Sequence, residues 1–249
     1  MYEIRLLIQQ DMKQLFTNVL WIFYNTLFPL LLVLIMGQLT GSQYEHSTSA
    51  YAFYTISFLV YSACNAATIA SNSFMEERIK QGNMRILYAP LTHDWLYRSK
   101  IIASTIFTFV CHLSVGVILV VIFDIPLGSH IGLLLLLLFL SEAFACCLGV
   151  LFCLLFQSES MANQVLSIFI NLSAVFGGIF FSIERFSGVF TALSNFSVMK
   201  WILQAAVYCI YDGNIQNVIL CSCCLSCLIL LILIVCKVIF REEVCVCSL

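Results

Sequence analysis

The stretch EERIKQGNMRILYAPLTHDWLYRSK, Glu76–Lys100, is a charged block in a chain that is otherwise almost wholly apolar. It holds three of the thirteen acidic residues and five of the eleven Lys and Arg residues. Outside this block the sequence is so apolar that the whole chain averages 62% hydrophobic and 10% charged residues, with a mean hydropathy of +1.03. Because soluble domains carry about 25% charged residues, the composition indicates a polytopic membrane protein. The net charge of −2 gives no indication of a nucleic-acid partner.

Six segments are apolar over the length of about 20 residues that a membrane-spanning helix needs. They are residues 19–39, 50–74, 101–123, 131–156, 160–182 and 215–238. We therefore expect an all-α membrane protein in which residues 1–249 form a single transmembrane domain. The first 18 residues differ, because apolar side chains recur at helical spacing from Ile4 to Leu15 while Arg5, Gln9 and Lys13 are polar. That pattern predicts an amphipathic helix at the membrane interface over 1–18.

The Lys and Arg residues predict the orientation of the six spans. If the N-terminus is cytoplasmic, nine of these residues face the cytoplasm: Arg5, Lys13, Arg78, Lys80, Arg85, Arg98, Lys100, Lys237 and Arg241. Only Arg185 and Lys200 then face outward. Cytoplasmic loops are enriched in Lys and Arg, so we expect a multi-pass plasma-membrane protein with both termini in the cytoplasm. The block at 76–100 is then the main cytoplasmic loop.

The first half of this loop has the pattern of a helix that binds another surface. Met84, Leu87, Tyr88 and Leu91 follow helical spacing and form one apolar stripe. Pro90 disfavours helix at the residue before it and so ends the run. A loop that only joins two spans needs a few residues and no apolar stripe. We therefore predict a helix over 76–91 that lies on the membrane surface and docks on a partner.

Two stretches resemble type-2 ATP-binding-cassette (ABC) permeases, the membrane subunits of bacterial exporters. The first cytoplasmic loop of that family carries an acid, a glycine, a leucine-rich turn ending in proline, and a lysine that opens the third span. The residues in those places are Glu77, Gly82, Arg85, Leu87, Pro90 and Lys100. The stretch AVFGGIFFSIERFSGVF, Ala174–Phe190, is similar to the end of the family's fifth span, at Gly178, Ile179, Phe180, Phe181, Ile183 and Glu184. Ser182 and Val198 stand where the family usually has prolines.

The resemblance implies the permease half of an ATP-driven exporter for a hydrophobic or amphipathic cargo, such as a drug, a peptide or a bacteriocin. It implies outer re-entrant helices within 183–211 and a coupling helix at 76–91 that sits on a separate ABC ATPase subunit. The coupling residues would be Glu77, Gly82, Met84, Arg85, Leu87, Tyr88 and Pro90. These 249 residues contain no GxxxxGK[ST] motif, so we expect no catalytic residue and no cofactor here, with ATP and Mg²⁺ bound by the ATPase. A second permease copy, identical or related, would complete the translocator.

Two ionisable residues lie near the middle of predicted spans, His112 in the third and Glu142 in the fourth. Because one span rises and the next returns, the two side chains could meet at a similar depth and offset the cost of burying them in lipid. Two interpretations stay open: a polar contact in the substrate path, or a hydrogen bond that holds the helices together. Asn25 and Asn65 are further candidates for the substrate path or for contact with a second copy.

The thirteen cysteines do not indicate a metal site. Most of them lie inside apolar runs, where cysteine packs as a small apolar residue. Cys224 and Cys227 have the CxxC spacing of zinc sites, but they lie in the middle of a span without polar neighbours.

Two other functions fit the sequence less well. An intramembrane protease of the CAAX-processing type carries EExxxR, whereas Glu76 and Glu77 are followed by Gln81 in place of the arginine. An ion-coupled carrier needs more polar residues in its spans or an inverted repeat between halves, and neither is evident in this sequence.

Overall fold

The computed structural model describes residues 2–41, 47–75, 94–126, 128–180 and 194–240, and every regular element in these ranges is a helix. In chain order the helices are α1 (Tyr2–Thr17), α2 (Val19–Thr40), α3 (Ser47–Met75), α5 (Asp94–Phe123), α6 (Ile131–Phe156), α7 (Glu159–Gly177), α9 (Val198–Tyr211) and α10 (Ile215–Ile239). Six of them, α2, α3, α5, α6, α7 and α10, are long and apolar enough to cross a membrane. The predicted all-α fold with six spans is therefore confirmed.

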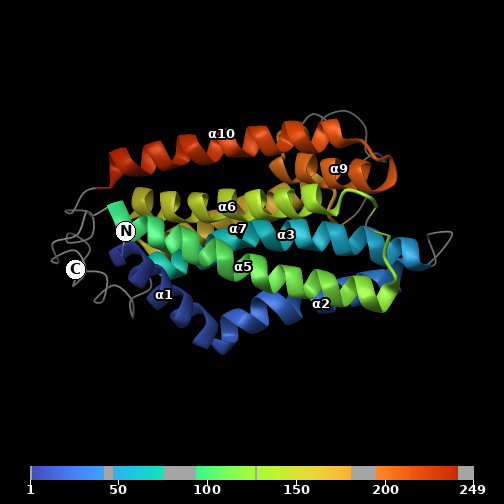
Figure 1. The fold of residues 1–249 in the computed structure, drawn as a ribbon, viewed down its shortest axis with the longest axis horizontal. Coiled ribbons are helices and arrows are strands. Elements are labelled where there is room, and N and C mark those ends of the chain that lie inside the picture. Colours follow the sequence, from blue (N-terminus) through green and yellow to red (C-terminus); the bar gives the residue numbers. More distant parts are fainter. Residues whose placement is uncertain (1, 42–46, 76–93, 127, 181–193, 241–249) are drawn as a thin grey trace.

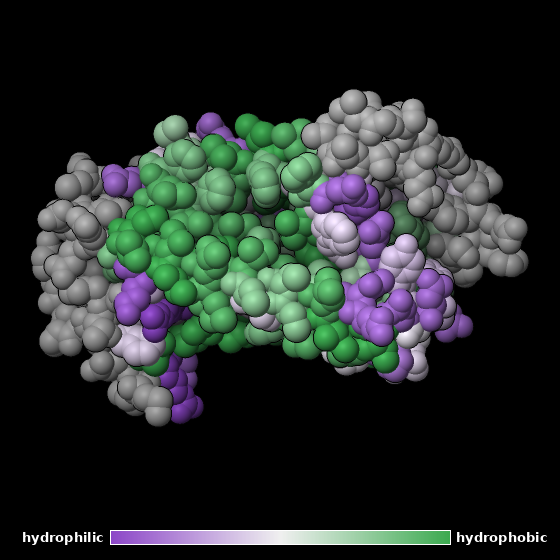
Figure 2. Space-filling view, turned by 90° about the horizontal axis from the view of Figure 1, so that it is seen from above, coloured by the Kyte–Doolittle hydropathy of each residue, from purple (hydrophilic) through white to green (hydrophobic). Residues whose placement is uncertain are grey.

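The six long helices run along the longest axis of the molecule (Figure 1). α1 and the last turn of α10 lie at one end of the bundle, whereas α9 lies at the opposite end beside α10. The face shown in Figure 2 is hydrophobic across its middle and hydrophilic near both ends. An apolar belt between two polar ends is the surface that a bilayer requires, so the chain is a multi-pass membrane protein.

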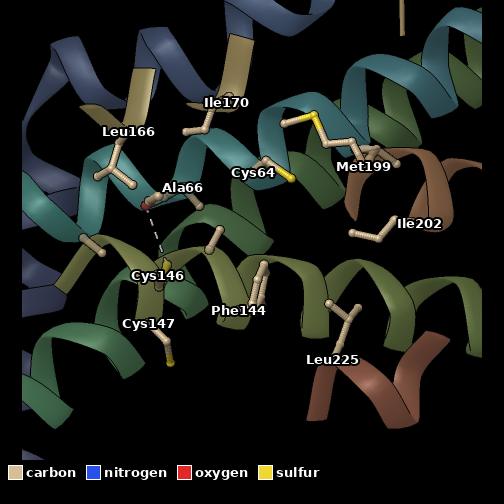
Figure 3. Close-up of a cluster of buried hydrophobic side chains, with 14 of the residues drawn as sticks. Cys64, Ala66, Phe144, Cys146, Cys147, Leu166, Ile170, Met199, Ile202 and Leu225 are labelled. Atoms are coloured by element: carbon tan, nitrogen blue, oxygen red, sulfur yellow. Dashed lines mark hydrogen bonds between the residues drawn. The ribbon is translucent and has the colours of Figure 1, made fainter. Parts of the chain in front are cut away.

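α3 is the central helix of the bundle and packs against α2, α5, α6, α7 and α9. Its contact with α6 is close because both helices present small residues. Gly149 of α6 lies against the backbone of Ala67, and Cys146 Sγ lies 3.7 Å from the carbonyl oxygen of Ala66 (Figure 3). Small side chains that allow backbones to approach are a common basis of helix packing in membranes.

α1 is a separate helix, as the sequence predicted, and Asn18 ends it. Asn18 has an extended backbone, and its side-chain oxygen accepts a hydrogen bond from Leu20 N at 3.2 Å, so it caps the start of α2. The apolar side of α1 packs on α5: Leu15 is buried beside Phe107, and the Phe16 ring meets Phe107 edge to face at 5.0 Å. The apolar stripe that the sequence predicted for α1 therefore packs against another helix of the same chain, α5.

α5 begins at Asp94, seven residues before the predicted span at 101–123, so the helix includes Lys100 and its ion pair with Asp11. One predicted span boundary was wrong. α7 ends at Gly177 rather than at residue 182. Gly178 takes a left-handed backbone with φ of 75°, and its N–H caps the helix on the carbonyls of Ala174 and Val175.

The predicted coupling helix at 76–91 lies outside the described residues, as does the part of the predicted outer segment at 183–193. The remainder of that segment contains α9, which has 14 residues and begins three residues before the predicted apolar stretch at 201–211. At 1.5 Å per residue α9 is about 21 Å long. It is therefore too short to cross a hydrocarbon core of about 30 Å.

Candidate functional site

The structure brings His112 of α5 and Glu142 of α6 together inside the bundle. His112 Nδ1 lies 2.9 Å from Glu142 Oε1, and both side chains are completely buried. Thr108, one turn before His112, donates its hydroxyl to Glu142 Oε2 at 2.9 Å. The pair forms because α5 and α6 run in opposite directions and each carries its ionisable residue near the middle of the helix.

A charged side chain at the centre of a bilayer costs about 2.5–3.5 kcal/mol. Hydrogen bonds between helices in membranes contribute about 0.6 kcal/mol each on average. The contacts from His112 and Thr108 therefore offset only part of the cost of burying Glu142. We propose that this pair acts as a link between α5 and α6.

Replacing Glu142 with Gln is expected to leave assembly and most transport intact, because the amide has nearly the same shape and can still hydrogen-bond to His112 and Thr108. Glu142→Leu leaves Nδ1 of the buried His112 without its partner, and this unsatisfied group is expected to lower the free energy of unfolding by about 1–3 kcal/mol. Thermal unfolding and transport in proteoliposomes measure the two effects. Complete loss of transport in a Glu142→Gln variant that assembles normally would show that the carboxylate has a functional role.

A cavity of about 290 Å³ lies beside the pair, between α3, α5, α6 and α9. Its lining is apolar except for His112, Thr55 and Ser141. The Ser141 hydroxyl donates to the Leu137 carbonyl of its own helix at 2.6 Å. Two buried atoms, Nε2 of His112 and Oγ1 of Thr55, have no hydrogen-bond partner within the described part of the chain.

A second group of polar side chains follows one face of α3. Tyr61, Asn65, Thr68 and Asn72 are spaced four, three and four residues apart, which places them on the same side of the helix. Tyr61 donates its hydroxyl to Asn171 of α7 at 3.0 Å. The amides of Asn72 and Asn163 of α7 are also in hydrogen-bond contact, at 2.5 Å. This α3 polar stripe, defined by the four α3 residues, therefore faces α7.

Asn25 and Asn65 are not part of the His112–Glu142 pair. Each donates its amide to the carbonyl four residues earlier in its own helix, Asn25 to Trp21 at 2.8 Å and Asn65 to Tyr61 at 2.9 Å. Asn25 lines a second cavity, of about 410 Å³, together with Thr68 and Asn72. The predicted substrate-path residues thus fall into two groups: His112 and Glu142 form the buried pair, whereas Asn65 belongs to the α3 polar stripe and Asn25 lies beside it.

A buried ion pair joins α1 to the first turns of α5. Lys100 Nζ lies 2.5 Å from Asp11 Oδ1, with the two side chains 3% and 8% exposed. Ser99 donates its hydroxyl to Asp11 Oδ2 at 2.9 Å. The Lys that opens the third span thereby holds α1 against the bundle, at the end where α1 and the end of α10 lie.

The family model described as ABC-2 type transporter matches residues 2–211. The chain belongs to the ABC-2 type transporter family. The match covers every helix described above except α10. No curated protein matches the sequence.

Membership makes this chain the membrane permease component of an ABC transporter, in agreement with its six spans. Such components generally leave ATP hydrolysis to another subunit. The coupling residues expected for this ABC-2 permease, Glu77, Gly82, Met84, Arg85, Leu87, Tyr88 and Pro90, all lie outside the described residues.

Two features of this ABC-2 permease were missed in the sequence. The α3 polar stripe was visible as helical spacing of polar residues, but the α7 partners that give it a direction are about 100 residues away along the chain. Asp11 lies on the apolar side of the α1 pattern, four residues after Leu7 and four before Leu15, so an acid on that side indicated a need for a partner, but nothing in the sequence connects it to Lys100.

Most of the described cysteines of this ABC-2 permease are buried. Cys146 and Cys147 of α6 lie in the core, where they pack as small side chains (Figure 3), and Cys153 of the same helix is also buried. Cys224 and Cys227 are exposed on α10. In the described ranges no three His, Cys, Asp or Glu side chains gather in a group that could hold a metal ion.

Proposed function

We propose that this ABC-2 permease is half of an ATP-driven exporter that moves a hydrophobic or amphipathic substrate out of the cell by alternating access. The family match over residues 2–211 carries the proposal. In it, ATP and Mg²⁺ bind to a separate ABC ATPase subunit, and closure of two such subunits shifts the spans between inward-open and outward-open states. Residues 76–91 form the coupling helix that transmits this movement.

The polar side of α3 supports a second permease copy in this exporter. Tyr61, Thr68 and Asn72 remain partly exposed on a helix that is otherwise mostly buried, and Asn171 of α7 is exposed beside them. Polar groups in a membrane face a protein neighbour or a water-filled path, because contact with lipid is unfavourable. A second copy placed against α2, α3 and α7 would cover this face and enclose a path between the two chains.

The proposed orientation places the end that carries α1 and the last turn of α10 in the cytoplasm. The distribution of Lys and Arg supports it, because nine of the eleven residues then lie on the cytoplasmic side. The Lys100–Asp11 ion pair would then lie at the cytoplasmic end of the bundle and hold α1 there. α9 would lie at the outer surface, where a helix shorter than the membrane thickness suits a re-entrant segment.

Replacing Leu87 with Asp tests this proposal. An apolar anchor of an interface contributes about 2 kcal/mol or more, so we expect the substitution to weaken association with the ATPase about thirtyfold. ATP-driven transport is expected to fall with it while the spans remain folded. Co-purification of the ATPase and transport of a lipophilic dye into inside-out vesicles measure the two effects.

Leu87→Met is the matched control, because it keeps an apolar side chain of similar volume. It is expected to retain both ATPase binding and transport. If Leu87→Asp binds the ATPase and transports as well as the unmodified chain, residues 76–91 are not the coupling surface.

A further inference from the structure

We propose that the cavity between α3, α5, α6 and α9 binds an uncharged, lipid-dissolved molecule that has an apolar chain and one hydrogen-bond acceptor oxygen. The proposal rests on the cavity of a single chain. Binding is therefore expected without an ATPase or a second copy, whether or not the chain acts as an exporter.

The cavity is elongated along the bundle. Its α5 lining extends from His112 to Val121 and its α6 lining from Ile131 to Ser141. At 1.5 Å per residue these stretches are about 14–15 Å long, or half of a hydrocarbon core of about 30 Å. The volume of about 290 Å³ is nearly twice that of the apolar cavity of about 150 Å³ known to bind benzene. A short apolar chain therefore fits.

The cavity is accessible from the membrane side. Three of its lining residues are also on the outer surface of the bundle: Val117 and Val121 of α5 are 56% and 76% exposed, and Ile131 of α6 is 44% exposed. They lie on the two helices that border the cavity along its length. A molecule dissolved in the lipid can thus enter between α5 and α6 without passing through water.

The inner end of the cavity offers a hydrogen-bond donor. His112 is a lining residue and directs Nδ1 at Glu142, which is not, so the opposite edge of the ring, with the buried Nε2, is the edge directed toward the cavity. The pair has two arrangements without net charge: imidazolium with carboxylate, or neutral imidazole with carboxylic acid. In both, Nε2 carries a hydrogen, because Nδ1 either donates to the carboxylate or accepts from the acid.

This N–H needs an acceptor, and no described residue supplies one. The Thr55 hydroxyl, 2% exposed and also without a partner, provides a second polar atom in the same lining. A water molecule could satisfy these atoms, but it would leave the apolar length of the cavity empty. A carbonyl oxygen on an apolar chain satisfies the N–H and fills the remaining space.

Photolabelling in lipid nanodiscs tests the site. The probe is a medium-chain methyl ketone with a diazirine near the end of its chain, and labelled residues are identified by mass spectrometry. We expect adducts on cavity residues such as Leu113 and Leu138. Unlabelled ketone is expected to compete about tenfold better than the alkane of equal length, because the alkane leaves the buried N–H unsatisfied.

Three variants make the result specific. Gly116→Leu places a side chain in the cavity, and a Cβ at this position meets only Leu59 at an ordinary 3.5 Å, so labelling is expected to disappear from a folded protein. Thr55→Val removes a hydroxyl that has no partner and is expected to reduce the preference for ketone over alkane. Ser114→Ala is the control on α5, because Ser114 does not line the cavity and its hydroxyl donates to Val110 of its own helix.

Two results would overturn the proposal. The first is labelling of the exposed α10 residues Leu220 and Ile234 that is as strong as labelling in the cavity and that persists in Gly116→Leu. This result would show that the ketone is only dissolved in lipid. Equal competition by ketone and alkane would show that the N–H of His112 takes no part in binding.

Discussion

Replacing Lys100 with Met is expected to lower the free energy of unfolding by about 3–5 kcal/mol. The substitution keeps the apolar length of the side chain but leaves the Asp11 carboxylate buried without its counter-charge. Among the described residues, the hydroxyl of Ser99 is the one hydrogen-bond donor that this carboxylate keeps. Because the ion pair joins α1 to α5, we expect α1 to separate from the bundle first. Thermal unfolding of the purified protein, followed by circular dichroism, measures the change.

Two controls separate the ion pair from a general effect of charge. Lys13→Met removes an exposed lysine of α1 and is expected to change stability by less than about 0.5 kcal/mol. The double variant Asp11→Leu with Lys100→Met removes both charges and is expected to recover most of the loss, since replacing a buried ion pair by apolar residues is often neutral. A Lys100→Met variant as stable as the unmodified protein would show that the pair does not hold α1.

Replacing Gly149 with Ala is expected to lower the free energy of unfolding by about 3 kcal/mol, at the upper end of the range for overpacked sites. The added Cβ would overlap the carbonyl oxygen of Ala67, a backbone atom that cannot rotate away. α3 and α6 would have to move apart along their closest contact, beside Cys146 and Ala66. Thermal unfolding and the yield of folded protein in detergent measure the effect.

Gly132 provides the matched control for Gly149, since both are glycines of α6. A Cβ at Gly132 meets no atom within 4 Å, so Gly132→Ala is expected to be neutral or slightly stabilising. Equal stability of the two variants would contradict the close packing of α3 on α6.

The six spans could be predicted from the sequence because the bilayer imposes a simple requirement. A helix that crosses about 30 Å of hydrocarbon needs about 20 apolar residues, and that length is visible in the chain itself. The ends of helices depend on partners instead. α7 stops early because Gly178 adopts a left-handed backbone, and Lys100, in the first turns of α5, lies inside the helix because it pairs with Asp11 of α1. Hydropathy contains neither kind of information.

The candidate site was predictable in part for a similar reason. His112 and Glu142 stand out as ionisable residues in the middle of apolar spans, and their pairing follows from two spans of opposite direction. The cavity beside them depends on how four helices pack, so nothing in the local sequence indicates it. The α3 polar stripe lies between these cases: its spacing is present in the sequence, but its partners on α7 emerge only in the fold.

The most direct measurement of the proposed function is ATP-dependent transport by the purified chain in liposomes, with and without the ABC ATPase subunit that co-purifies from its native membrane. A lipophilic fluorescent dye serves as the transported probe. We expect dye movement only when the chain, the ATPase, ATP and Mg²⁺ are all present, because the family to which the chain belongs supplies the permease component. Transport by the chain alone, at a rate unaffected by the ATPase and by ATP, would contradict the proposed function.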